Sequence, residues 1–286
     1  MKREKRKGWI VCALGMLLIA AGLTKTPALS AMGRAQAGVR VTILMYHSVL
    51  KNPKMAGMYV VSPDTLEQDL KYIKKKGYTA VFVRELTEYV YKNAPLPEKP
   101  VVITLDDGYL NNLTYVLPLL EKYDMKATIS VVGRYTEQAT EDGAEKPSYS
   151  YLTIEEVQKL AESGRVEIGV HSYDMHGQEQ RKGAGKRKGE STGAYQTEFR
   201  RDTEKALSVL KKSGLANPVV YTYPFGEISE DSEPVLREMG FLATLSCRER
   251  QNYITKESAC LWRLGRYNRP SGISTKHFME KALEGK

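Results

Sequence analysis

The chain has 286 residues, of which 42% are hydrophobic and 27% charged, and its formal net charge is +9. This length suffices for one large domain with a good core, and no second domain is needed. The charge does not indicate a nucleic-acid partner, because most of it lies in two segments. Residues 1–7 carry +4 (five bases less Glu4) and residues 177–194 carry +3, so the rest of the chain is near +2.

The amino end predicts export. Basic residues at 2–7 precede an apolar stretch from Gly8 to Leu23, which is the layout of a secretory signal peptide or an uncleaved membrane anchor. The stretch is short for a bilayer span, which needs about 20 apolar residues, yet residues 26–31 form only an imperfect cleavage site. Both interpretations of residues 1–31 stay open. Either one places a domain of residues 39–286 outside the cytoplasm, secreted or anchored to the outer face of the cytoplasmic membrane.

From Val39 onward, short apolar runs alternate with amphipathic stretches, which predicts an α/β barrel. A first strand is expected at 41–46, and a helix then runs from its cap Ser62 to Gly77. The following expected elements are a strand at 78–83, a helix at 86–92, a strand ending at Asp106, a helix at 113–123 and a strand at 127–132.

The alternation continues to the carboxyl end. Residues 133–150 are polar and irregular, and a loop is expected there. The remaining expected elements are a helix at 153–164, a strand at 166–170, a helix at 195–213, a strand at 219–223, a helix at 232–239, a strand at 241–246 and a terminal helix at 274–283.

Polar side chains follow two of these strands. Asp106 and Asp107 end the run that begins at Val101, and His171 is the first polar residue after the strand at 166–170. The carboxyl ends of parallel strands meet at one edge of the sheet, so both segments point to one place. His171 and His176 with one carboxylate are a common ligand set for Zn²⁺ or a similar ion, and the second aspartate is then free to act as a base.

Each motif alone also has a purely structural interpretation. The segment Asp106-Asp107-Gly108 suits a turn with capping acids, and two histidines five residues apart suit a polar loop, because this spacing does not place them on one helix face. The two motifs together favour a metal site, since two of the four histidines of the chain lie within six residues after a strand.

Four motifs in order resemble the polysaccharide deacetylases of the NodB-homology type, from about Val39 to Arg269. The motifs are Leu-Met-Tyr-His-Ser-Val at 44–49, Thr-Leu-Asp-Asp-Gly-Tyr at 104–109, the segment from His171 to His176, and Tyr-Thr-Tyr-Pro-Phe-Gly at 221–226. The chain looks most like the branch that acts on poly-N-acetylglucosamine or related cell-surface glycans. The resemblance implies an irregular (β/α) barrel, a metal held by Asp107, His171 and His176, and Asp106 as general base.

The resemblance also implies a substrate-binding loop at Tyr223, Pro224, Phe225 and Gly226, with a backbone N–H near Phe225 that stabilises the oxyanion. Taken alone, this segment is a Pro-Gly turn with an aromatic residue packed beneath it. Tyr109 would suit stacking on a sugar ring.

Two departures from the family pattern concern proton transfer. Many relatives have an arginine two residues before the proline, where this chain has Thr222, and that arginine orients the base. Arg263 or Arg266 could replace it from another strand, and Arg263 is our candidate. The late histidine that protonates the leaving amine in many relatives is also missing. His47 could act as the general acid or as a hydrogen-bonding support, and a satisfied core histidine fits its position equally well.

The sequence thus predicts an exported hydrolase that removes N-acetyl groups from an N-acetylglucosamine-containing glycan, either a cell-surface polymer or peptidoglycan, by general-base attack of metal-bound water. Zn²⁺ is the default ion, with Co²⁺, Ni²⁺ and Fe²⁺ as alternatives. A glycan-binding protein with little turnover, or a deacetylase of O-acetyl esters or small amides, stays open. The basic segment 177–194 is either a solvated loop or a rim that attracts an anionic polymer. An uncleaved N-terminal segment would add the membrane as a partner.

Overall fold

The computed structural model describes residues 38–143, 146–177, 181–215 and 217–285. The predicted signal or anchor at 1–31 lies outside these residues. In the part of the chain that is described, no helix has the length and apolar character required to cross a bilayer.

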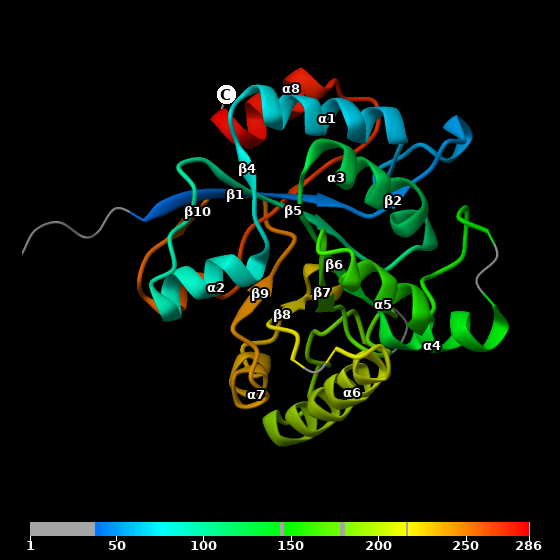
Figure 1. Cartoon of the computed structure of the whole chain (residues 1–286). Coiled ribbons are helices and arrows are strands. Elements are labelled where there is room, and N and C mark those ends of the chain that lie inside the picture. Colours follow the sequence, from blue (N-terminus) through cyan, green and yellow to red (C-terminus); the bar gives the residue numbers. More distant parts are fainter. Residues whose placement is uncertain (1–37, 144–145, 178–180, 216, 286) are drawn as a thin grey trace, which may run out of the picture. The chain divides into compact units, whose positions relative to one another are not determined.

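A mostly parallel sheet forms the centre of the described domain (Figure 1). Seven of its strands follow one another in the order β10-β1-β5-β6-β7-β8-β9, with β11 beside β1 and β4 beside β5. The strands are β1 (Val39–Tyr46), β4 (Thr79–Ala80), β5 (Pro100–Leu105), β6 (Ala127–Val131), β7 (Val166–Val170), β8 (Val220–Thr222), β9 (Ala243–Leu245), β10 (Asn252–Ile254) and β11 (Tyr267–Asn268). A separate parallel pair consists of β2 (Ser48–Val49) and β3 (Val60–Val61).

Residues 264–268 join the two sides of this sheet. Leu264 forms a parallel bridge with Leu245 of β9, and β11 pairs with Leu44 and Met45 of β1. Because β1 and β9 stand on opposite sides of the strand order, the sheet closes on itself through a segment that pairs for only a few residues. The predicted irregular (β/α) barrel is confirmed.

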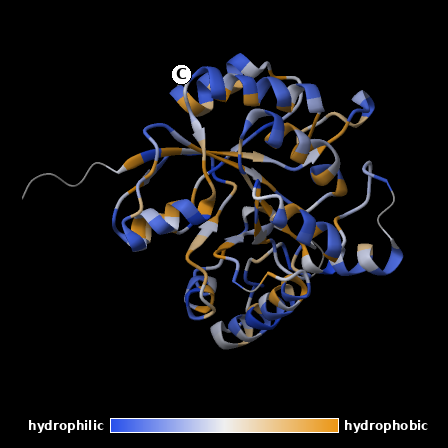
Figure 2. Ribbon diagram, in the orientation of Figure 1, coloured by the Kyte–Doolittle hydropathy of each residue, from blue (hydrophilic) through white to orange (hydrophobic). Residues whose placement is uncertain are grey.

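Helices cover the outside of the sheet (Figure 1). They are α1 (Pro63–Lys75), α2 (Val83–Lys92), α3 (Leu117–Tyr123), α4 (Gly133–Asp142), α5 (Ile154–Glu162), α6 (Thr192–Lys212), α7 (Ser232–Glu238) and α8 (Thr275–Met279). Short turns of 3-10 or π geometry occupy Pro53–Met55, Asn112–Val116, Pro224–Gly226, Ser258–Leu261 and Glu280–Glu284. Figure 2 shows hydrophobic colour concentrated in the central strands and mixed colour on the helices, as expected for elements with one buried face.

Local signals explain where several elements begin. The hydroxyl of Ser62 accepts a hydrogen bond from the backbone N–H of Thr65 at 3.0 Å, and α1 starts at Pro63 as predicted. Thr153 and Glu156 form a reciprocal capping box at the start of α5. Every residue of β5 is buried, which accounts for its continuous apolar run.

Two predicted elements were wrong in part. The expected loop at 133–150 begins with α4, whose N-cap residue Val132 makes no side-chain capping bond and whose sequence buries only Gly133 and Thr136. It therefore lacks both the cap and the apolar stripe that predict a helix. The expected strand at 78–83 pairs only as β4, because α2 already begins at Val83, with the carboxylate of Glu85 accepting from the N–H of Phe82 at 2.8 Å.

Candidate active site

Asp107, His171 and His176 meet at the carboxyl edge of the sheet, and one donor atom of each lies within 4.8 Å of the other two. Oδ1 of Asp107 is 3.1 Å from Nε2 of His176 and 3.4 Å from Nε2 of His171. Nδ1 of His171 lies 2.8 Å from the backbone oxygen of Thr222, which leaves Nε2 facing the cluster. Two imidazole nitrogens and one carboxylate oxygen, oriented in this way, fit a divalent ion.

The backbone after β5 and β7 is unusual. Asp107 has φ of +73° and Ser172 has φ of +67°, a region that residues other than glycine adopt rarely. Gly108 follows with φ of +75°, and a Cβ there would lie 2.8 Å from Cγ1 of Val131. Strained backbone of this kind gathers at functional sites, where the surrounding structure holds it in place.

Asp106 has a different set of partners from its neighbour Asp107. Nη1 and Nη2 of Arg266 donate to Oδ1 and Oδ2 of Asp106 at 2.7 and 2.8 Å, and both side chains are buried. Nε of Arg266 also donates to the backbone oxygen of Ser246 at 2.9 Å. Burial tends to raise the pKa of Asp106, but the charge and hydrogen bonds of Arg266 outweigh it, so the pKa falls below its usual value. Asp106 is thus held ionised.

Asp107 is also kept ionised. Burial again tends to raise the pKa, and the hydrogen bonds with His171 and His176 bring it well below the ordinary range.

The structure does not bring Arg263 to Asp106, and this corrects our candidate for the orienting arginine. The guanidinium of Arg263 lies 3.6 Å from Glu233 and 4.0 Å from Glu230 instead. Arg263 lies in a turn with φ of +58°, and its side chain is partly exposed. Leu264 and Arg266, which follow this turn, are buried.

His47 lies beside the same carboxylate. Its Nε2 is 3.8 Å from Oδ2 of Asp106, and its Nδ1 is buried without a hydrogen-bond partner among the described residues. Burial lowers the pKa of His47 more than the nearby charges of Asp106 and Asp107 raise it. His47 also lines the cavity that opens at this cluster, so it belongs to the site by position.

A cavity of about 650 Å³ opens at this cluster, and its lining includes Tyr109 and Phe225. The ring of Phe225 lies 4.7 Å from that of His176. Within the loop, Tyr223 and Pro224 are buried and do not line the cavity. This differs from the expectation that both contact the substrate. The hydroxyl of Tyr223 is hydrogen-bonded to Oγ of Ser232 at 2.8 Å, which makes it a support of the loop.

Gly226 allows this loop to approach its neighbour closely. A Cβ on Gly226 would lie 2.8 Å from Cβ of Cys247, which is itself part of the cavity lining. Gly226 therefore contributes close packing at the edge of the cavity.

Sequence reasoning missed one residue that holds the histidine loop. Asp202, on α6, accepts hydrogen bonds from the backbone N–H groups of Tyr173 and Asp174, both at 2.8 Å. The signal was present, because Asp202 shares the apolar face of the predicted helix with Phe199 and Ala206, and a carboxylate there needs partners.

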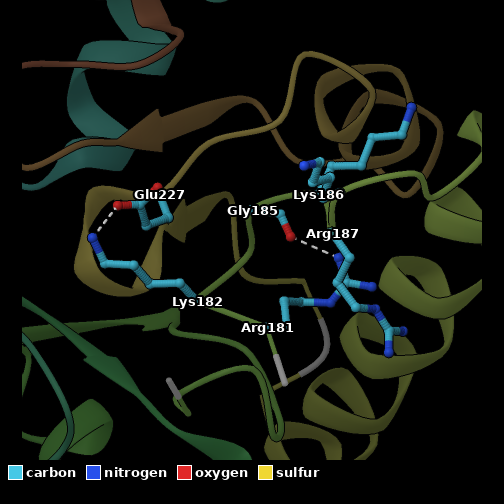
Figure 3. Close-up of a pocket in the computed structure, with 7 residues that line it drawn as sticks. Arg181, Lys182, Gly185, Lys186, Arg187 and Glu227 are labelled. Atoms are coloured by element: carbon cyan, nitrogen blue, oxygen red, sulfur yellow. Dashed lines mark hydrogen bonds and ion pairs between the residues drawn. The ribbon is translucent and has the colours of Figure 1, made fainter. Parts of the chain in front are cut away.

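The described part of the basic segment is ion-paired and packs against the substrate loop. Figure 3 shows Lys182 reaching toward Glu227, with Nζ and Oε1 2.5 Å apart. The other pairs are Arg181 and Arg187, each with Glu190 and Glu198, and Lys186 with Asp231. A Cβ on Gly183 would lie 2.4 Å from the backbone oxygen of Pro224, and Lys182 also lines the catalytic cavity. Acidic neighbours therefore offset most of this positive charge.

A closed, mostly parallel α/β sheet with a carboxylate and imidazole cluster beside an arginine-held aspartate indicates a hydrolase. The sequence profile of the polysaccharide deacetylase family matches residues 93–244, just over half of the chain. The protein belongs to this family.

Individual relatives agree with this assignment. A poly-β-1,6-N-acetyl-D-glucosamine N-deacetylase of Escherichia coli (strain K12) is 25% identical over 217 residues, which are 69% of this chain and 32% of the relative. The chain thus spans about a third of the length of that protein.

Two solved structures share the fold. The de-N-acetylase from Aggregatibacter actinomycetemcomitans has a TM-score of 0.69 at 21% identity, covering 84% of this chain and 99% of that one. IcaB from Ammonifex degensii has a TM-score of 0.67 at 24% identity, covering 86% and 97%.

Proposed function

We propose that this protein is an exported, metal-dependent deacetylase that removes N-acetyl groups from a polysaccharide containing N-acetylglucosamine. The observation that carries the proposal is that two adjacent aspartates have separate partners. Asp107 meets two histidines, and Asp106 is bound by Arg266. The activity named for the Escherichia coli relative supports this class of substrate.

Asp107, His171 and His176 would hold the ion, with Zn²⁺ as first candidate and Co²⁺, Ni²⁺ or Fe²⁺ as alternatives. Such an ion polarises an amide carbonyl and lowers the pKa of a water toward about 7. Asp106 would accept the proton of the attacking water. Arg266 donates one hydrogen bond to each oxygen of Asp106 and so orients this carboxylate, and each oxygen keeps an acceptor position for the proton.

The leaving nitrogen must gain a proton before it departs as an amine. His47 is our choice for the general acid. Because burial lowers the pKa of His47, its neutral imidazole would first take the water proton from Asp106, whose Oδ2 lies 3.8 Å from Nε2, and would then pass it to the nitrogen. The backbone N–H of Phe225 would donate to the carbonyl oxygen as negative charge develops there. Tyr109 and Phe225 would contact the sugar.

The layout of the amino end supports this assignment from a separate part of the chain. Residues 1–31 have the layout of a signal peptide or anchor, and a glycan polymer of the cell surface or peptidoglycan lies on the far side of the membrane. The protein would then be secreted or held on the outer face of the cytoplasmic membrane.

The test is the release of acetate and free amine from N-acetylglucosamine oligomers and from peptidoglycan, with and without added Zn²⁺ or Co²⁺. We expect metal-dependent release that Asp106→Asn abolishes while metal binding is retained. Binding of both metal and glycan without release would instead identify a glycan-binding protein. Release from O-acetylated substrates alone would identify an esterase.

A further inference from the structure

The rim of the catalytic cavity beside His47 carries large side chains that stay exposed. Met58 and Tyr59 are 59% and 56% exposed, and both line the cavity. Exposed apolar side chains are common singly on a surface, but their concentration at the mouth of a catalytic cavity is typical of a ligand-binding surface.

Hydrogen bonds hold the backbone that carries these exposed side chains. The pairing of β2 with β3 is extended by a hydrogen bond from the N–H of Ser48 to the backbone oxygen of Tyr59 at 3.1 Å. The backbone N–H of Ser271 donates to the backbone oxygen of Gly57 at 3.0 Å, and the hydroxyl of Ser271 donates to the backbone oxygen of Val60 at 2.5 Å. Met58 lies between these anchored residues, so its position at the rim is fixed from both sides.

Asn268 holds Met58 in the same wall. Its Nδ2 donates to the backbone oxygen of Met58 at 3.0 Å and lies 3.3 Å from the sulfur of that residue. Its Oδ1 is buried without a partner among the described residues, so it is not offered to a ligand. Asn268 also lines the cavity and therefore fixes both the position of Met58 and the shape of this part of the wall.

We propose that Tyr59, Met58 and Asn268 form a subsite for a pyranose ring adjacent to the sugar that is deacetylated. The apolar face of this ring would stack on Tyr59, whose own ring lies 4.6 Å from that of His47. The inference rests on the proposed function and deepens it, because a second subsite makes an oligomer the preferred substrate over the monosaccharide.

The experiment compares acetate release from N-acetylglucosamine and from its oligomers. Because a stacked ring contributes modestly to binding, Tyr59→Ala should raise KM for oligomers by about five- to tenfold. KM for the monosaccharide should stay unchanged, and Tyr59→Phe, which keeps the ring, should resemble the wild type. Asn268→Ala should raise the oligomer KM by about fivefold, because it removes the hydrogen bond that holds Met58 at the rim.

Tyr253→Ala is the matched control, because Tyr253 is equally exposed, at 59%, on β10 and does not line the cavity. The subsite is overturned if Tyr59→Ala has the same KM as the wild type at every chain length, or if Tyr253→Ala changes KM equally.

Calorimetric binding of an oligomer separates this inference from the proposed function. If the wild type releases no acetate but binds the oligomer more tightly than Tyr59→Ala does, the subsite stands and the deacetylase proposal fails. Equal binding by the two proteins, or no binding by either, overturns the subsite.

Discussion

At the scale of single residues, the adjacent aspartates Asp106 and Asp107 have different partners. Both are buried, which alone would favour the neutral form. Arg266 holds both oxygens of Asp106, whereas Asp107 faces two imidazoles. These partners suit the two roles that we propose, a base at Asp106 and a metal ligand at Asp107. Asp107 has a positive φ in this arrangement, in which the two neighbouring carboxylates meet different partners.

Arg266→Met tests whether Asp106 depends on Arg266 as its partner. The substitution leaves the buried carboxylate of Asp106 unpaired, and we expect a loss of about 3–5 kcal/mol in the free energy of unfolding. Denaturant unfolding measures it. Arg263→Met is the matched control, since the ion-pair partners of Arg263 among the described residues are Glu230 and Glu233 and its side chain is partly exposed. A control that loses as much stability as Arg266→Met would contradict the assignment.

The dependence of stability on pH provides a second test of Asp106. Its pKa in the folded protein lies below the ordinary value of 3.8. Its charge therefore stabilises the fold above the unfolded-state pKa, and this contribution disappears as pH falls through the folded-state value. The difference in Tm between the wild type and Asp106→Asn should shrink as pH is lowered from about 6 to about 3. A difference that does not change over this range would show that Asp106 is not charge-stabilised.

At the scale of elements, the sequence predicted the structures whose signals are local. The apolar runs of β1, β5 and β7 and the caps Ser62 and Thr153 all marked their elements. The helix α4 has no such signal. The short strand β10 was missed because its three residues gain their partner only by antiparallel pairing with β1, more than 200 residues earlier.

Asp202 shows how one helix positions a loop of the site. Asp202→Ala removes the acceptor for two backbone N–H groups in the loop that ends at His176. Metal affinity, measured by competition with a chromophoric chelator, should fall about 10- to 100-fold. Glu204→Ala, an exposed position on the same helix, should leave the affinity unchanged. Unchanged affinity in Asp202→Ala would mean that the loop holds its shape without α6.

At the scale of the whole domain, closure of the sheet completes the site. Asp106 and Asp107 directly follow β5, His171 directly follows β7, and His176 lies in the loop after it, so these four residues could be predicted. Arg266 could not be chosen over Arg263 from the sequence, because only the bridge of Leu264 to β9 decides which of the two faces inward. Thr222 provides no guanidinium, and its backbone oxygen orients His171 instead.

The central claim is that Asp107, His171 and His176 bind one divalent ion and that Asp106 does not. Calorimetric titration of Zn²⁺ into the metal-free wild type, His176→Ala and Asp106→Asn tests it most directly. We predict one site of similar affinity in the wild type and Asp106→Asn, and its loss in His176→Ala. Retained binding in His176→Ala, or lost binding in a folded Asp106→Asn, would contradict this account.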